Sequence, residues 1–177
     1  MKIVFYVAYI GKIFLIFLTK LGRFTRFTWR IISQGLHGPF YTKIFLNHLI
    51  NIGFLSLPVV GLTSIFTGMV LALQSYTGFS RFSAESAIPN VVVLSITREL
   101  APVLAGLMVA GRSGAAIAAE IGTMKVTEQI DALKTLSTNP YNYLFIPRIL
   151  AGIVSLPFLV FVGDIIGVFG GYLICTE

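Results

Sequence analysis

Two adjacent charged residues, Arg98 and Glu99, stand inside a long apolar run of this chain. Placing Arg or Asp at the centre of a membrane helix costs about 2.5–3.5 kcal/mol, so ionisable groups at that depth mark functional sites by default. Successive residues of a helix point about 100° apart, which prevents the two side chains from sharing one face. The residues alone leave two roles open: an ion pair that fixes helix packing, or a polar cavity wall that contacts a substrate.

Small residues follow this charged pair along the same run. Gly111, Ala115 and Ala119 recur at every fourth position, and Gly114 with Ala118 forms a second pair of small residues. This spacing lets two helix backbones approach closely in a membrane. We therefore expect helix packing at Gly111, Gly114, Ala115 and Ala119. The phosphate-binding pattern G-x-x-x-x-G-K-[ST] is absent from the sequence, which excludes nucleotide hydrolysis by that route.

The character of the chain changes at residues 123–137. Apolar residues keep a helical spacing while charged residues fill the other positions: Val126, Ile130, Leu133 and Leu136 against Lys125, Glu128, Asp131 and Lys134. We expect a short amphipathic helix there, stopped by Asn139 and Pro140. Such a helix either lies on the membrane or docks a partner subunit. The mixture of charges favours docking, because membrane-surface helices usually prefer Lys and Arg.

The elements that carry these residues must cross a membrane. The 177 residues are 56% hydrophobic and 11% charged, which is outside the usual balance of soluble proteins. Three apolar runs, near residues 52–73, 88–119 and 149–174, exceed the roughly 20 residues that a membrane-spanning helix needs. They lack the alternation of barrel strands. The sequence therefore predicts an all-α polytopic membrane protein with three transmembrane helices.

The second run poses a length problem. A helix over residues 88–119 would be about 48 Å long, whereas the hydrocarbon core is about 30 Å thick. One end must project, or the helix must tilt or break. Pro102, one turn after the charged pair, removes a backbone hydrogen bond and is expected to kink the helix.

The net charge of +6 comes largely from residues that precede the first span. By the positive-inside rule, the N-terminus and the segment with Lys125 and Lys134 are inside, and the segment with Arg81 is outside. We divide the chain into an N-terminal interfacial segment, residues 1–43, and a transmembrane domain, residues 44–177. Residues 3–18 are expected to form a short interfacial helix, and the alternating basic and aromatic residues 23–30 a headgroup anchor. This placement argues against nucleic acid as a partner.

No chemistry of the enzymatic kind is indicated. The sequence shows no nucleophile–base set, and His37 and His48 have no metal-ligand spacing, so we expect neither catalysis nor a metal or cofactor. The single cysteine, Cys175, excludes an intramolecular disulfide.

The segment RELAPVLAGLMVAGRSGAAIAAEIGTMKVTEQIDALKTLSTNPYNYLFIPRILAG resembles the signature region of the MlaE/YrbE permease family. The flanking segments FTGMVLALQSY and LPFLVFVGDIIGVFGGYL are also similar to that family. Members are membrane subunits of ABC transporters that move phospholipids in bacterial inner membranes and plastid (chloroplast) envelopes. The resemblance implies a homodimer of permeases, a separate ATP-binding ABC subunit and an MCE-domain substrate-binding protein, with membrane lipids as cargo.

The resemblance also implies roles for matching positions. Arg98 and Glu99 would lie beside the lipid-binding cavity, and the region from Glu120 to Leu136 would hold the coupling helix that receives the ATPase. The residues expected to couple to the ATPase are Glu120, Lys125, Glu128, Gln129, Asp131 and Leu133. Family members usually continue with two further spans after GGYL, whereas this sequence ends at Glu177, so we expect a shortened copy or one completed by a separate segment.

Two other classes of membrane protein are compatible with the residues. One is a non-transporting scaffold or assembly subunit, including an inactive shortened copy. The other is a small ion-coupled carrier that would titrate Glu99 and Asp164; such carriers usually contain paired repeats, and none is evident.

Overall fold

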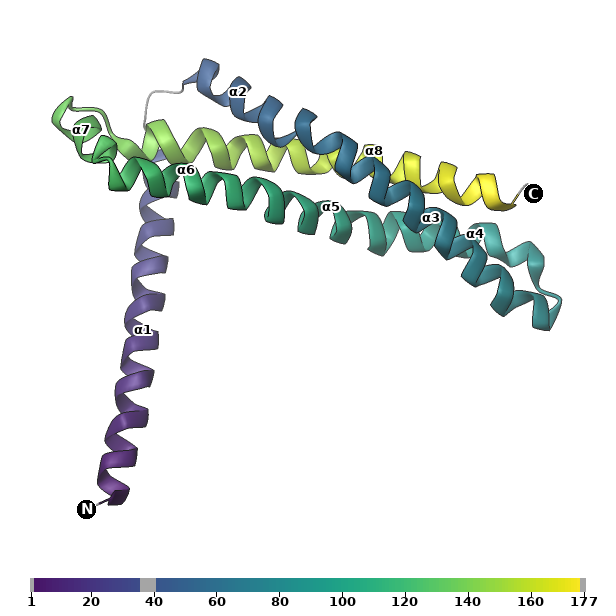
Figure 1. Cartoon of the computed structure of the whole chain (residues 1–177), viewed down its shortest axis with the longest axis horizontal. Helices are drawn as coiled ribbons and strands as arrows, with labels where there is room; N and C mark the ends of the chain where they lie inside the picture. Colours follow the sequence, from purple (N-terminus) through teal and green to yellow (C-terminus); the bar gives the residue numbers. More distant parts are fainter. Residues whose placement is uncertain (1, 36–40, 176–177) are drawn as a thin grey trace.

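The computed structural model describes residues 2–35 and 41–175, and within these ranges the chain is helical without a strand. Three longer helical stretches run side by side (Figure 1). The N-terminal helix α1 (Lys2–Gly35) projects away from them, and its C-terminal part contacts the third stretch, where the ring of Phe27 packs against those of Tyr141 and Phe145. These stretches are Thr42–Phe79, Ile88–Val126 and Tyr141–Cys175, with 38, 39 and 35 residues. All three are long and apolar enough to cross a membrane, which confirms the prediction of an all-α polytopic membrane protein.

Each stretch is assembled from several elements. The first contains α2 (Thr42–Ile52), the 3₁₀ turn η1 (Phe54–Ser56) and α3 (Leu57–Phe79). The second contains α4 (Ile88–Ser95), the π-helical turn η4 (Ile96–Leu100), α5 (Ala101–Val109), a second π-helical turn η5 (Ala110–Gly114) and α6 (Ala115–Val126). The third contains the π-helical turn η6 (Tyr141–Phe145) and α8 (Ile146–Cys175). Short turns η2 (Ser80–Phe82) and η3 (Glu85–Ala87) join the first to the second, and α7 (Gln129–Thr135) lies between the second and the third.

Rows of small, buried residues at every fourth position hold α3 against α8. The row on the first stretch is Ser56, Val60, Ser64, Gly68 and Ala72, and the row on α8 is Ala151, Ser155, Leu159, Gly163, Gly167 and Gly171. Interlocking rows with this spacing are one of the common ways in which helices pack. Gly68 faces the backbone of Gly167 and Gly171 directly, so the two helices meet almost backbone to backbone.

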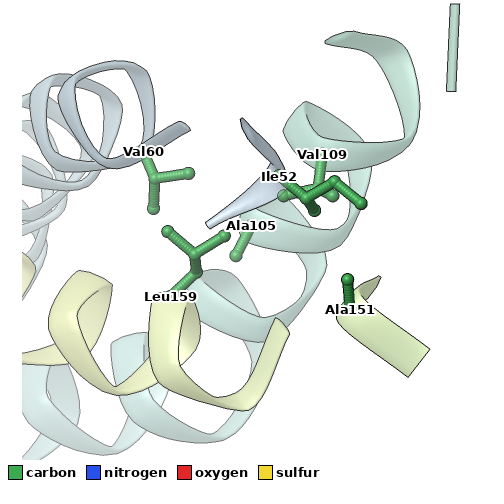
Figure 2. Packing of buried hydrophobic residues seen from close by; sticks show 6 residues of the cluster. All are labelled: Ile52, Val60, Ala105, Val109, Ala151 and Leu159. Atoms are coloured by element: carbon green, nitrogen blue, oxygen red, sulfur yellow. The ribbon is translucent and has the colours of Figure 1, made fainter. Parts of the chain in front are cut away.

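The second stretch presents its own buried row to these two helices. Ile88, Val92 and Ile96 are four residues apart, the next buried residue is Ala101, and the four-residue spacing then resumes through Ala105, Val109 and Ser113. Figure 2 shows Ala105 from this row near Leu159 and Val109 near Ile52, all members of one core cluster. The five-residue step coincides with the π turn η4, which inserts one extra residue and so keeps the row on the same face.

Pro102 explains the position of that π turn. A proline in a helix lacks an N–H, and its ring clashes with the carbonyl of the residue four positions earlier, here Arg98. The wider turn relieves this clash, and the N–H of Ala101 bonds to the carbonyl of Ile96, five residues back. Pro147 follows the π turn η6 in the same way. The stretch thus passes Pro102 without an interruption of its helical structure, by widening one turn.

Two sequence-based expectations about helix extent were wrong. Residues 123–137 do not form one amphipathic helix, because α6 ends at Val126, Glu128 adopts a left-handed backbone conformation (φ 58°), and α7 has only seven residues. At the N-terminus, the expected short helix over residues 3–18 is part of one continuous 34-residue helix. Residues 23–30 continue that helix, and the hydroxyls of Thr25 and Thr28 donate hydrogen bonds to carbonyls of the preceding turn.

The contact between α3 and α8 yields a direct test. A Cβ atom at Gly68 would overlap the carbonyl group of Gly167 and lie 3.1 Å from the backbone nitrogen of Gly171, whereas a Cβ at Gly78 meets nothing within 4 Å. Gly68→Ala is therefore expected to lower the free energy of unfolding by about 3 kcal/mol, the upper end of usual overpacking effects. Gly78→Ala should be neutral or stabilising by up to about 1 kcal/mol, because Ala favours a helix.

Thermal or denaturant unfolding of the purified protein in detergent measures the difference between these two variants. Equal stability of Gly68→Ala and Gly78→Ala would contradict the close backbone contact.

Candidate functional site

Arg98 and Glu99 both lie in the π turn η4, near the middle of the second stretch. Both side chains are exposed, because they fall between the buried residues Ile96 and Ala101 and point away from that row. Neither belongs to an ion pair among residues 2–35 and 41–175. Their interpretation as an ion pair that fixes packing within the chain therefore has no support in this structure.

The exposed face that carries Glu99 continues along the second stretch as far as Ala119. Residues at every fourth position from Glu99 are exposed: Val103, Leu107, Gly111, Ala115 and Ala119. Gly114 is exposed beside them, and a Cβ at Gly111 or Gly114 would meet nothing within 4 Å. The small residues predicted for helix packing thus pack against no other helix of the described chain. A helix that uses this face has to come from outside it.

A buried ion pair connects the end of the second stretch to the start of the third. Arg148 is 5% exposed, and its Nη2 lies 2.6 Å from Oε1 of the half-exposed Glu120. Its Nη1 also donates a hydrogen bond to the carbonyl of Leu144 (3.2 Å). Because a buried charge needs a partner, this pair fixes α6 to α8 at the two ends of the segment that contains α7.

Arg112 lies in the π turn η5, and its Nη1 donates a hydrogen bond to Oγ of Ser56 (3.0 Å). The carboxylate of Glu120, further along the same helix, is paired with Arg148 instead.

The segment around α7 is held by a small cluster of charges. Asp131 accepts hydrogen bonds from Lys134 (2.6 Å) and Lys125 (3.2 Å), and these bonds hold the pKa of its carboxyl below the ordinary value of 3.8. A lowered pKa means that the stabilisation is complete above that ordinary value and is lost only as the pH falls through the lowered pKa. The cluster is therefore fully formed at neutral pH.

Other side chains of this segment are free to meet a partner. Glu128 and Gln129 are exposed, and Leu133 is half-buried. Two apolar residues that flank α7 are among the most exposed in the described chain: Val126 at 84% and Leu136 at 74%. These two side chains give the α7 segment exposed apolar surface beside its charged residues.

Sequence reasoning missed the ion pair of Arg148, because its partner Glu120 lies 28 positions earlier and no local spacing links the two. It also did not predict that Ser56 bonds to Arg112, which lies 56 positions later in the chain. Within the part of the chain that the structure describes, no group of three or more His, Cys, Asp or Glu side chains could hold a metal ion.

Comparison with known proteins places these features in a family. The family model "Permease MlaE" matches residues 45–177. A "Probable ABC transporter permease protein" of Rickettsia felis is 60% identical over 165 residues, which cover 93% of this chain and 64% of that protein. The "Intermembrane phospholipid transport system permease protein MlaE" of Haemophilus influenzae is 38% identical over 177 residues, covering 99% of this chain and 67% of that protein. "Protein TRIGALACTOSYLDIACYLGLYCEROL 1, chloroplastic" of Arabidopsis thaliana is 41% identical over 130 residues, covering 73% and 37%.

This chain therefore spans about 64% of the length of the Rickettsia relative. The family match covers the three membrane-crossing stretches, the charged pair and the α7 segment together. The chain thus belongs to the MlaE permease family, whose members are integral membrane components of transport systems and not enzymes.

Proposed function

We propose that this chain is the membrane-spanning permease subunit of an ABC transporter that moves phospholipids between membranes. One observation carries the proposal: Arg98 and Glu99 are exposed on a π turn in the middle of an apolar span. Two charged side chains cannot face hydrocarbon at that depth without a large energetic penalty. They must line a polar space or meet another protein, and a permease cavity provides both.

A second copy of the chain is the partner that best fits this face. The row from Glu99 to Ala119 has the same four-residue spacing as the rows that join α3 and α8, and its small residues allow an equally close approach. A symmetric pair of these faces would bring two copies of Arg98 and Glu99 around a shared space. In this arrangement the lipid cavity lies between the two permeases.

A separate ATPase subunit would bind at the α7 segment. Val126 and Leu136 present apolar side chains on either side of α7, and Glu128 and Gln129 add polar groups beside them. The ion pair between Glu120 and Arg148 would pass a movement of α7 to both adjoining spans. An MCE-domain protein completes the proposed system, which would reside in a bacterial inner membrane or a plastid envelope; the chloroplastic and phospholipid-transport relatives support this placement.

The first prediction concerns the ATPase. Val126→Asp together with Leu136→Asp removes the exposed apolar contacts without touching the cluster around Asp131, and should reduce co-purification with the ATPase at least about tenfold (about 1.4 kcal/mol). Ser83→Asp, an exposed residue between α3 and α4, is the matched control and should leave the complex intact. Undiminished co-purification of the double variant would rule out docking at α7.

The second prediction concerns self-association. Ala115→Leu adds bulk to the exposed row and should weaken dimerisation in liposomes by about tenfold (about 1.4 kcal/mol), measured by single-molecule photobleaching. Gly78→Leu adds similar bulk at an open position of α3 and should leave dimerisation unchanged. If the two variants dimerise alike, this face is not the interface.

The third prediction concerns transport. Arg98→Gln and Glu99→Gln remove the charges but keep similar side-chain sizes, and each should lower ATP-driven phospholipid transfer between vesicles by about tenfold or more (about 1.4 kcal/mol). The neighbouring exposed Thr97, changed to Val, provides the control. A scaffold role predicts the opposite result: normal transfer by both charge variants in a complex that still assembles.

A further inference from the structure

A partly enclosed cavity of about 430 Å³ lies between α2 and the η5–α6 region, and the sequence did not predict it. Its volume is in the usual range of small-molecule sites. One part of its wall is polar, with His48, Asn51, Arg112 and Glu120, and Ile52 and Ile117 supply an apolar part. A site with this mixture suits a ligand that has both a polar and an apolar portion.

The charge of the wall is positive. The carboxylate of Glu120 is already paired with the buried Arg148, so these two charges offset each other. Arg112 has no ion-pair partner in the described ranges, and its one hydrogen bond among them goes to the neutral hydroxyl of Ser56, which is 2% exposed. That bond orients the guanidinium while leaving most of its five N–H donors for a ligand. The cavity therefore favours an anion with several acceptor oxygens.

The backbone conformation at Arg112 is a second feature that indicates a functional site. The π turns η4 and η6 are each followed, two residues later, by a proline that accounts for them, Pro102 and Pro147. The turn η5 has no such proline, because Ala115 and Ala116 follow it. Isolated π turns occur frequently at functional sites. This one sets the direction of Arg112 and has no other evident cause.

An apolar cavity of about 260 Å³ adjoins the first one. The two share Ile52, Ser113 and Ile117. The second is otherwise lined by Arg148 and by six apolar or small residues of the second and third stretches: Val109, Ala110, Gly114, Phe145, Ile149 and Gly152. A phosphate group bound at Arg112 would thus have an apolar space next to it. Glycerophospholipids combine these two chemistries, whereas inorganic phosphate uses only the first.

We propose that Arg112, with His48 and Asn51, binds the phosphate of an anionic glycerophospholipid at a site separate from Arg98 and Glu99. Arg112 follows Arg98 by 14 residues, which is about 21 Å along the helix, so the two sites lie at different depths in the membrane. The site is at the end of the stretch that leads to α7 (Figure 1), where a lipid of the inner leaflet would enter or leave. This inference deepens the proposed function and rests on it, since it assumes that lipid is the cargo.

Binding can be tested without ATPase or transport. The full chain is reconstituted into phosphatidylcholine nanodiscs, and the binding of phosphatidylglycerol is measured by native mass spectrometry. Arg112→Gln is expected to weaken that binding about tenfold (about 1.4 kcal/mol). Asn51→Asp, at an exposed side chain, should weaken it as well, by placing a negative charge in the cavity without disturbing the core. Arg112→Lys keeps the charge and should retain part of the binding.

Matched controls lie at the opposite end of the molecule. Arg81→Gln and Asn90→Asp make the same chemical changes at exposed residues near the turn between α3 and α4 (Figure 1), and should leave binding unchanged. Equal binding by the wild type and the Arg112→Gln and Asn51→Asp variants would overturn the site. Full displacement of the lipid by inorganic phosphate at similar concentration would overturn the assignment to a lipid headgroup.

The outcomes also separate this site from the proposed function. Lipid binding that depends on Arg112, combined with no ATP-driven transfer by the assembled wild-type complex, would refute the transport role and leave the site in place. Normal phospholipid transfer by the wild-type complex, combined with lipid binding that is unchanged in Arg112→Gln, would refute the Arg112 site but not the transport role.

Discussion

The close approach of α3 and α8 is the contact on which the rest of this structure depends. Gly68 leaves room for the backbone of Gly167 and Gly171, and the small residues on either side continue the same row. In a membrane, helix association relies on such van der Waals contact, because lipid tails are as apolar as the side chains they would replace. The two helices form a surface with one fixed spacing, and the second stretch has to match it.

That requirement explains why the charged pair points outward. The second stretch keeps a buried residue at every fourth position, and Pro102 would disturb the helix in the middle of this row. The π turn at Ile96–Leu100 absorbs the proline and adds one residue, so that the row resumes at Ala101. Within the turn, Ile96 stays in the buried row, and the side chains of Arg98 and Glu99 are exposed. The π turn that keeps the buried row of the second stretch in register thus also places Arg98 and Glu99 on the opposite, exposed face.

The sequence was sufficient to predict the three membrane-spanning stretches, because an apolar run of about 20 residues or more is the direct signature of a membrane-spanning helix. It also located the charged pair and the small residues around Gly111, since both are local patterns. It could not find the pair formed by Glu120 and Arg148, because these residues are far apart in the sequence and meet only in the folded chain. The division between α6 and α7 was missed for a different reason. Glu128 adopts a left-handed conformation there, which is uncommon for any residue other than glycine and has no signature in the hydrophobic pattern.

The pair formed by Glu120 and Arg148 determines what a movement of α7 can do. Without this pair, the short segment between α6 and α8 would absorb a displacement by bending. With it, both ends of the segment are joined through a guanidinium that is almost fully buried, and such a group is strongly disfavoured without its partner. In the proposed transporter, a push on α7 would therefore reach α6 and α8 together. Arg112 precedes Glu120 by eight residues, about 12 Å along the same helix, so the proposed headgroup site lies within the part that would move.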